Sequence, residues 1–176
     1  LSMMPNMTVL APKNDRELED MLEFAVAWNG PVAIRYPRGS AYQGLHEHRA
    51  PVEYGRSEIL TRGKEIAILG VGSMIPSCEE VCRGLREDGY EPTLVNARFV
   101  KPLDVELLDQ LAKDHSLFVT VEENVKSGGY GEHIAAYMEA CHPEVRVLTA
   151  TVWDQFVPQG KVDSLRARIG LGVEDI

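Results

Sequence analysis

Apolar residues recur with a helical period near the start of the chain. Four of them fall at positions i, i+3, i+4 and i+7: Leu18, Met21, Leu22 and Ala25. This spacing predicts a helix with one apolar face, and Asn14 three residues before Glu17 is the capping-box pattern of a helix start. Short apolar runs at 7–11 and 32–35 flank the helix. The first 35 residues therefore predict a β-α-β unit, two parallel strands joined by a right-handed crossover.

From residue 63 onward, strands and helices alternate regularly. Apolar runs predict strands at 65–71, 93–98, 117–122 and 145–150. Helical spacing predicts helices at about 77–88, from 104, after 128 and at 162–169. The positions expected to face inward are Cys78, Val81, Cys82, Leu85, Val105, Leu108, Leu111, Ala112, Ile134, Tyr137, Met138 and Cys141. Apolar strands covered on both faces indicate an α/β fold, a three-layer domain with a mostly parallel sheet.

The stretch 36–62 lacks periodicity and is punctuated by proline and glycine, which predicts a linker with one short edge strand near 57–60. Its charge differs from that of the remaining chain. Residues 30–62 hold five arginines against three glutamates, whereas 63–176 hold 11 basic and 19 acidic residues. The sequence therefore favours 30–62 as the place for an anion site.

Composition narrows the classes of partner. The 176 residues carry a formal net charge of −9, which opposes general attraction to nucleic acid or to an anionic bilayer. No apolar run approaches the roughly 20 residues of a membrane helix, so we expect a soluble protein. Three cysteines, an odd number, and the lack of a basic head with an apolar run at the start favour a reduced, cytoplasmic compartment.

Two sets of possible metal ligands are present. A zinc site from Cys78, Cys82, Cys141 and His142 would require cysteines to leave an apolar helix face, so we expect buried thiols and no metal. The segment His46-Glu47-His48 offers two imidazoles but no third ligand nearby, which predicts a solvated loop. His115 and His133 fall near element boundaries, where we expect surface positions.

Two glycine-rich turns could hold phosphate. Gly70-Val71-Gly72 lies between a strand and a helix, but Ile75 stands where a dinucleotide fingerprint has its third glycine, so a steric role is favoured. The turn 128–131 opens a helix, and the preceding Glu122-Glu123 would repel phosphate, which favours a structural or interface role. Because adjacent strand residues face opposite ways, these two carboxylates do not converge as an acid/base pair. No Gly-x-Ser-x-Gly motif supports nucleophilic catalysis.

The segment Arg35-Tyr36-Pro37-Arg38-Gly39 follows the carboxyl end of a predicted parallel strand, where ligands bind in open α/β sheets. An arginine held there presents a planar fork that matches two phosphate oxygens. The alternative is a salt link between domains, a role that we assign to Arg35.

Four segments together resemble a known family. Residues 5–13, Ile34–Gly39, Asn96–Asp104 and Val121–Asn124 are similar to the C-terminal part of the 1-deoxy-D-xylulose-5-phosphate synthase family, in order and over nearly the whole chain. Lys-Pro-Leu-Asp and Val-Glu-Glu followed by Gly-Gly also occur loosely in transketolases and in the beta subunits of 2-oxo-acid dehydrogenases. Arg-Tyr-Pro-Arg-Gly with Asn-Ala-Arg-Phe-Val-Lys-Pro-Leu-Asp is more specific to the synthase.

The resemblance implies a thiamine diphosphate and Mg²⁺ enzyme that decarboxylates pyruvate and joins the remaining two carbons to D-glyceraldehyde 3-phosphate. The product feeds isoprenoid, thiamine and pyridoxal synthesis, and family members are dimers with three domains. It further implies that 1–40 ends the pyrimidine-binding domain, 41–58 is the linker and 59–176 is the transketolase C-terminal-like domain. Carried over by position, the arginine that binds the phosphate of the acceptor falls on Arg38.

The resemblance also implies what this chain lacks. The family's Gly-Asp-Gly motif, which helps to hold Mg²⁺ and the diphosphate, does not occur, and the catalytic glutamate and histidines belong to segments before Leu1. We therefore expect no catalytic, cofactor-binding or metal-binding residue here, and a fragment that is inactive alone. The alternatives are a transketolase fragment and a stand-alone, non-catalytic binding or dimerisation module.

Overall fold

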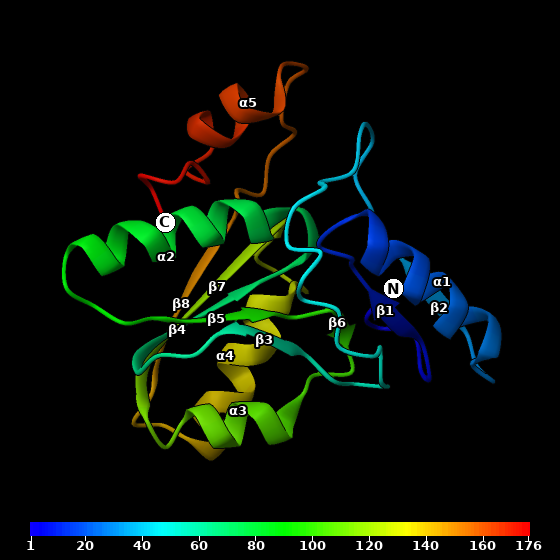
Figure 1. The fold of residues 1–176 in the computed structure, drawn as a ribbon, viewed down its shortest axis with the longest axis horizontal. Helices are drawn as coiled ribbons and strands as arrows, with labels where there is room; N and C mark the ends of the chain where they lie inside the picture. Colours follow the sequence, from blue (N-terminus) through cyan, green and yellow to red (C-terminus); the bar gives the residue numbers. More distant parts are fainter.

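The computed structural model describes residues 1–176, which build two β-sheets with helices around them (Figure 1). The strands are β1 (Thr8–Leu10), β2 (Val32–Ile34), β3 (Glu58–Thr61), β4 (Glu65–Gly70), β5 (Thr93–Asn96), β6 (Phe99–Lys101), β7 (His115–Val125) and β8 (Arg146–Val152). The helices are α1 (Asp15–Ala27), α2 (Ile75–Glu87), α3 (Val105–Leu111), α4 (Tyr130–Cys141) and α5 (Val162–Arg168), and a short 3₁₀ turn, Gly72–Met74, precedes α2. None of these helices has the length and apolar composition needed to cross a membrane.

The larger sheet has the strand order β3-β5-β4-β7-β8. Its last four strands are parallel, and β3 is the antiparallel edge strand. Helix α2 covers one face of this sheet, and α3 and α4 cover the other (Figure 1). The predicted three-layer α/β domain with a mostly parallel sheet is confirmed, as is the predicted edge strand after the linker.

Each face of the larger sheet has its own apolar core. On the α2 side, Cys78, Val81 and Cys82 are buried as predicted. On the other side two predictions are wrong. Val105 is 41% exposed because it is the first residue of α3, and Leu107, two residues later, is buried instead. Cys141 is exposed because it is the last residue of α4, after the residues with which this helix joins the apolar core.

The predicted β-α-β unit is confirmed, with β1 and β2 parallel and α1 between them. The Asn14 side chain caps α1 by accepting a hydrogen bond from the Glu17 amide at 2.9 Å. One inward position is wrong: Met21 is buried but Leu22 is 52% exposed, because the small sheet beneath α1 is only three strands wide.

The third strand of that small sheet was not predicted. It is β6, which pairs antiparallel with β1 and gives the order β2-β1-β6. Phe99 of β6 forms a small buried cluster with Leu10 and Met21. The first strands of the chain therefore share a sheet with a strand that lies some 90 positions later in the sequence.

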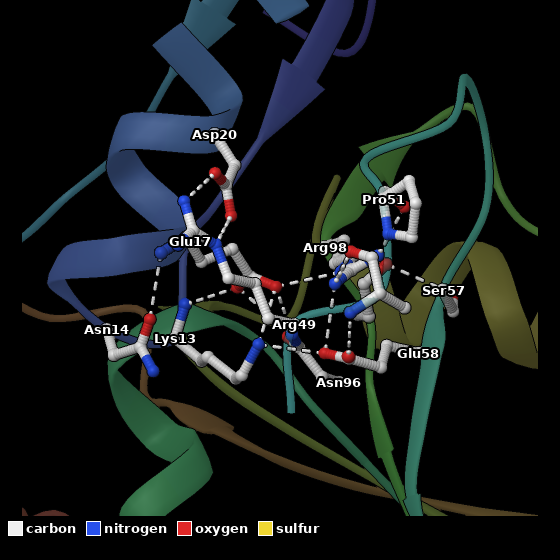
Figure 2. Close-up of polar contacts among 12 residues, drawn as sticks. Lys13, Asn14, Glu17, Asp20, Arg49, Pro51, Ser57, Glu58, Asn96 and Arg98 are labelled. Atoms are coloured by element: carbon white, nitrogen blue, oxygen red, sulfur yellow. Dashed lines mark hydrogen bonds and ion pairs between the residues drawn. The ribbon is translucent and has the colours of Figure 1, made fainter. Parts of the chain in front are cut away.

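A buried ion-pair network joins the two sheets and the linker (Figure 2). It consists of Lys13, Glu17, Glu58 and Arg98. Lys13 Nζ lies 2.9 Å from Glu17 and 2.8 Å from Glu58, and Arg98 contacts the same two carboxylates at 2.8 and 3.0 Å. Two cations and two anions balance, which meets the condition for burying charge in a protein interior.

Polar neighbours complete the ion-pair network. Asn96 Nδ2 donates to both carboxylate oxygens of Glu17, and Arg98 donates to the carbonyl oxygens of Ala50 and Pro51 (Figure 2). The amide of Ala50 in turn donates to Glu58 at 3.0 Å. The linker is therefore held against the sheet by backbone hydrogen bonds as well as by its ends.

Candidate functional site

A groove of about 590 Å³ opens where the segment after β2 meets the starts of α1 and α2 and helix α5. It is lined by Pro12, Lys13, Asn14, Leu18, residues 36–42, Ser73, Pro76, Val162 and Arg166. One side comes from the N-terminal unit, which is the β-α-β unit with the segment that follows it up to residue 42. The other side comes from the larger domain, which is the larger sheet with its helices from residue 58 onward. The groove therefore depends on the association of the two.

The lining of the groove has an unusual charge for this chain. It contains three cationic side chains, Lys13, Arg38 and Arg166, and no aspartate or glutamate. The whole chain, by contrast, has 27 acidic residues and a net charge of −9. A local excess of positive charge of this kind favours an anionic ligand.

Arg38 is the cation that the fold leaves free. It is exposed and makes no hydrogen bond or ion pair within the chain, whereas Lys13 is buried and already contacts Glu17 and Glu58. Pro37 restricts the backbone before Arg38, and Gly39 after it has a φ of +120°, a value that non-glycine residues rarely adopt. The local sequence thus fixes a turn that presents Arg38 at the groove.

Arg166 reaches the groove from α5 and is held by the larger domain. Its Nε donates to Glu123 at 2.8 Å, and its Nη2 lies 3.3 Å from the backbone carbonyl oxygen of Ser73. Burial opposes ionisation of Glu123, but hydrogen bonds from Arg166 and Ser73 outweigh it, so the pKa of this carboxyl is lowered.

Arg35 joins the N-terminal unit to the end of β7, as predicted for a residue that links domains. Its Nη2 donates to the backbone carbonyl oxygen of Glu123 at 2.6 Å. The link is therefore a hydrogen bond to the main chain rather than the predicted salt link.

Glu122 occupies the N-terminus of α4, where the sequence favours a structural role over a phosphate site. Its carboxylate is buried and accepts hydrogen bonds from the amides of Tyr130 and Gly131 at 3.0 and 2.8 Å, so it caps α4. Burial raises the pKa of Glu122, and the two amide hydrogen bonds oppose this rise. The side chains of Glu122 and Glu123 have separate partners, which is consistent with their predicted failure to converge.

The turn at Gly72 packs closely against the N-terminal part of the chain. It lies at the carboxyl ends of β4 and β7, the usual ligand crevice of such a sheet. A Cβ atom on Gly72 would lie 3.0 Å from the Cβ of Ala11, and the glycine has a φ of +53°. The residue that follows β1 therefore packs against this glycine, which supports the steric interpretation.

The histidines include one incorrect prediction. His115 is 5% exposed rather than at the surface, and its ring nitrogens lie 2.7 Å from Thr93 Oγ1 and 2.9 Å from the Leu111 carbonyl oxygen. The reason is that β7 begins at His115, two residues earlier than predicted, so the ring turns inward. In the loop pair, His46 contacts Asp15 at 2.6 Å and remains partly exposed. No three His, Cys, Asp or Glu side chains gather as possible metal ligands.

Sequence reasoning missed Ser73 and Arg166. Arg166 lies 128 positions after Arg38, and no local pattern connects the two. The available signal was topological: the loop after β4 is expected at the ligand-binding edge of a parallel sheet, which would have drawn attention to Ser73.

The model of the family described as "Transketolase, C-terminal domain" matches residues 55–176. Among curated proteins, the 1-deoxy-D-xylulose-5-phosphate synthase of Lachnoclostridium phytofermentans is 44% identical over 177 residues, and that of Chlorobaculum tepidum is 39% identical over 178. Both alignments cover 100% of this chain and 28% of the relative. The chain thus spans little more than a quarter of the length of these relatives.

Among solved structures, a split-gene transketolase described as an inactive beta4 tetramer superposes with a TM-score of 0.92 and 28% identity, covering 99% of this chain and 56% of that one. The transketolase of Campylobacter jejuni shares the fold, with a TM-score of 0.68 and 17% identity over 98% of this chain and 25% of its own. The chain therefore belongs to the transketolase C-terminal domain family, and over its whole length it is similar to 1-deoxy-D-xylulose-5-phosphate synthases.

Proposed function

We propose that this chain is part of a 1-deoxy-D-xylulose-5-phosphate synthase, a transferase that condenses pyruvate with D-glyceraldehyde 3-phosphate, releases CO₂ and supplies isoprenoid, thiamine and pyridoxal synthesis. The identity of 44% to a synthase over the whole chain supports this assignment. The whole enzyme would bind thiamine diphosphate and Mg²⁺, and the cofactor supplies the electron sink for decarboxylation. We assign to the residues of this chain no contact with the cofactor or the ion, because the Gly-Asp-Gly motif of the family does not occur in the sequence.

The observation that carries the role of this chain is the free guanidinium of Arg38 in a groove without acidic side chains. We assign Arg38 to the phosphate group of the aldehyde acceptor. A charge-assisted hydrogen bond of this kind is worth about 1.5–3 kcal/mol, or roughly 10- to 100-fold in affinity.

The test is steady-state kinetics of the full-length enzyme with Arg38→Ala. We expect the KM for D-glyceraldehyde 3-phosphate to rise about 10- to 100-fold, with little change in the KM for pyruvate. Arg83→Ala is the matched control, because Arg83 is exposed on α2, away from the groove, and has no partner in the chain. Equal effects of Arg38→Ala on both substrates would overturn the assignment.

We also propose the division of the chain into 1–40, the end of the pyrimidine-binding domain, 41–58, the linker, and 59–176, the C-terminal domain. The family match begins at residue 55, a few residues before the second boundary, and supports a boundary in that region. We further propose a homodimeric, cytoplasmic enzyme, in keeping with the synthase family.

A transketolase is the second candidate, favoured by the TM-score of 0.92 to the split-gene transketolase. The donor distinguishes the two, because the synthase uses pyruvate and a transketolase uses a ketose phosphate. The isolated 176 residues should turn over neither donor, since we assign to them no cofactor-binding residue. Thiamine diphosphate-dependent turnover by them would contradict the fragment proposal. A native gene product of 19.6 kDa would instead indicate a stand-alone, non-catalytic binding or dimerisation module.

A further inference from the structure

We propose that Arg166 of α5 is a second contact for the phosphate group of the acceptor, opposite Arg38 in the same groove. The proposal rests on the proposed function and extends it, because it assigns a substrate contact to the larger domain as well as to the N-terminal unit. Residue 166 lies in the last turn of a helix that no sequence motif had connected with a ligand.

The hydrogen-bonding capacity of Arg166 supports this role. A guanidinium has five N–H donors, and in this structure the contacts of Arg166 are with Glu123 Oε1 and, at 3.3 Å, with the Ser73 carbonyl oxygen. The side chain is 17% exposed, and the groove is the space that it faces. Donors therefore remain for a ligand.

The charge balance around the groove points to the same ligand. Lys13 is neutralised within the ion-pair network, so its charge is already balanced. Arg166 has one carboxylate partner, Glu123, which does not line the groove, and Arg38 has none, so the two arginines together keep one positive charge in excess. A phosphate would bring the missing negative charge.

The contact with Glu123 also fixes the direction of the Arg166 guanidinium. An arginine held in place by a neighbouring carboxylate loses less conformational freedom when it binds a ligand than a free one does. Arg38 has no such support. The groove thus contains one arginine that is free to reorient, Arg38, and one that is already held in place, Arg166. Together they could contact a compact anion from two sides.

The rival explanation is that Arg166 only fastens α5 to the sheet through Glu123. The two explanations predict different effects on the KM for the phosphorylated acceptor when either partner of the Arg166–Glu123 ion pair is substituted. If Arg166 only fastens α5, Arg166→Gln and Glu123→Gln should impair the enzyme alike. If Arg166 binds phosphate, Glu123→Gln removes a negative charge that competes with the phosphate, while the glutamine oxygen still accepts the hydrogen bond that holds Arg166 in place, so the two variants should diverge.

The experiment measures the KM of the full-length enzyme for D-glyceraldehyde 3-phosphate and for unphosphorylated D-glyceraldehyde. We expect Arg166→Gln to raise the first KM about 10- to 100-fold, the range for a charge-assisted contact, and to leave the second unchanged. Arg166→Lys, which keeps the charge but loses the fork, should give a smaller rise. Glu123→Gln should not raise the KM for the phosphorylated acceptor.

Each other outcome has a definite meaning. A similar rise with Arg166→Gln and Glu123→Gln, for both acceptors, would show a fastening role and overturn the inference. If Arg38→Ala raises the KM for the phosphorylated acceptor and the Arg166 variants do not, the inference fails and the proposed function stands. If neither arginine affects that KM, the proposed role of the groove fails as well. Should Arg166→Gln not fold, the same comparison is made with Arg166→Lys and Glu123→Gln. A rise in the KM for the phosphorylated acceptor in Arg166→Lys alone would support the inference, and an equal rise in both variants would overturn it.

Discussion

Glu122 and Glu123 are neighbours in the sequence, yet the fold has opposite effects on their acidities. Glu122 is buried against the start of α4 and burial raises its pKa, while Arg166 and Ser73 hold the pKa of Glu123 below its ordinary value. The difference follows from the alternation of side chains along a strand, which directs one carboxylate to a helix terminus and the other to a cation. A motif of two acidic residues therefore serves two separate structural tasks.

The lowered pKa of Glu123 predicts a dependence of stability on pH. As the pH falls below 4.5, the ordinary pKa of this carboxyl, the unfolded chain takes up the proton before the folded chain does. The stability that Glu123 contributes is complete above that pH and is lost as the pH falls through the lowered, folded-state pKa.

Urea unfolding of the chain between pH 3 and pH 7 tests this dependence. We expect the loss of stability in acid to be less steep in Glu123→Gln than in the unaltered chain. Glu174→Gln, at an exposed position, is the control and should leave the slope unchanged. A Glu123→Gln chain with the original slope would contradict the prediction.

At the scale of elements, the turn before α4 packs closely against the carboxylate of Glu122. Gly129 has an ordinary φ of −79°, so its backbone does not require glycine. The space does: a Cβ atom there would lie 2.6 Å from Glu122 Oε1 and 2.8 Å from the Val125 carbonyl oxygen. Close approach of Glu122 to the helix amides thus depends on the absence of a side chain at position 129.

We therefore expect Gly129→Ala to destabilise the chain by about 1–3 kcal/mol, the usual cost of overpacking. Gly84→Ala is the matched control of opposite sign, because Gly84 lies in the exposed interior of α2 with nothing within 4 Å of its Cβ position. There alanine should stabilise the helix by about 0.8–1 kcal/mol. Free energies of unfolding in urea check both, and a loss of equal size at the two glycines would refute the role of close approach.

Most elements followed from local pattern, because apolar spacing directly reflects which face of a helix or strand is buried. The stripe of α2 and the Asn14 cap of α1 are examples. The sequence could not predict that β6 pairs with β1, since that pairing depends on how two distant segments meet. The same holds for the candidate site. The turn around Arg38 was predictable from Pro37 and Gly39, whereas the position of Arg166 beside the groove depends on tertiary contacts.

At the scale of the molecule, the ion-pair network holds the N-terminal unit, the linker and the larger domain in one arrangement. Glu17 is its centre, because its carboxylate accepts hydrogen bonds from Lys13, Asn96 and Arg98. Asn96 Oδ1 is the one buried side-chain polar atom without a partner in the chain. The groove has walls from both sides of this network, so its shape depends on the network.

Glu17→Gln should therefore destabilise the chain strongly, by about 3–5 kcal/mol, the cost of leaving buried charge unpaired. The exposed pair Arg16–Glu19 supplies the control, since Glu19→Gln should cost at most about 0.5 kcal/mol. Urea unfolding gives both values, and hydrogen exchange should show that Glu17→Gln loosens α1 and the linker together. A loss below 1 kcal/mol in Glu17→Gln would mean that the network is not needed to hold the parts in place.

The pairing of β6 with β1 also affects how the polypeptide can be divided. By sequence the natural cut falls in the linker, yet the backbone hydrogen bonds of the small sheet run across that cut. A chain trimmed to begin at residue 59 would retain β6 as an uncovered edge. Its unpaired amides and carbonyls could then form hydrogen bonds with strands of other molecules, so the trimmed chain would be prone to aggregation. Gene fission, limited proteolysis or protein engineering at this linker would therefore yield two pieces that must find each other again, whereas a break upstream of β1 would leave the shared sheet intact.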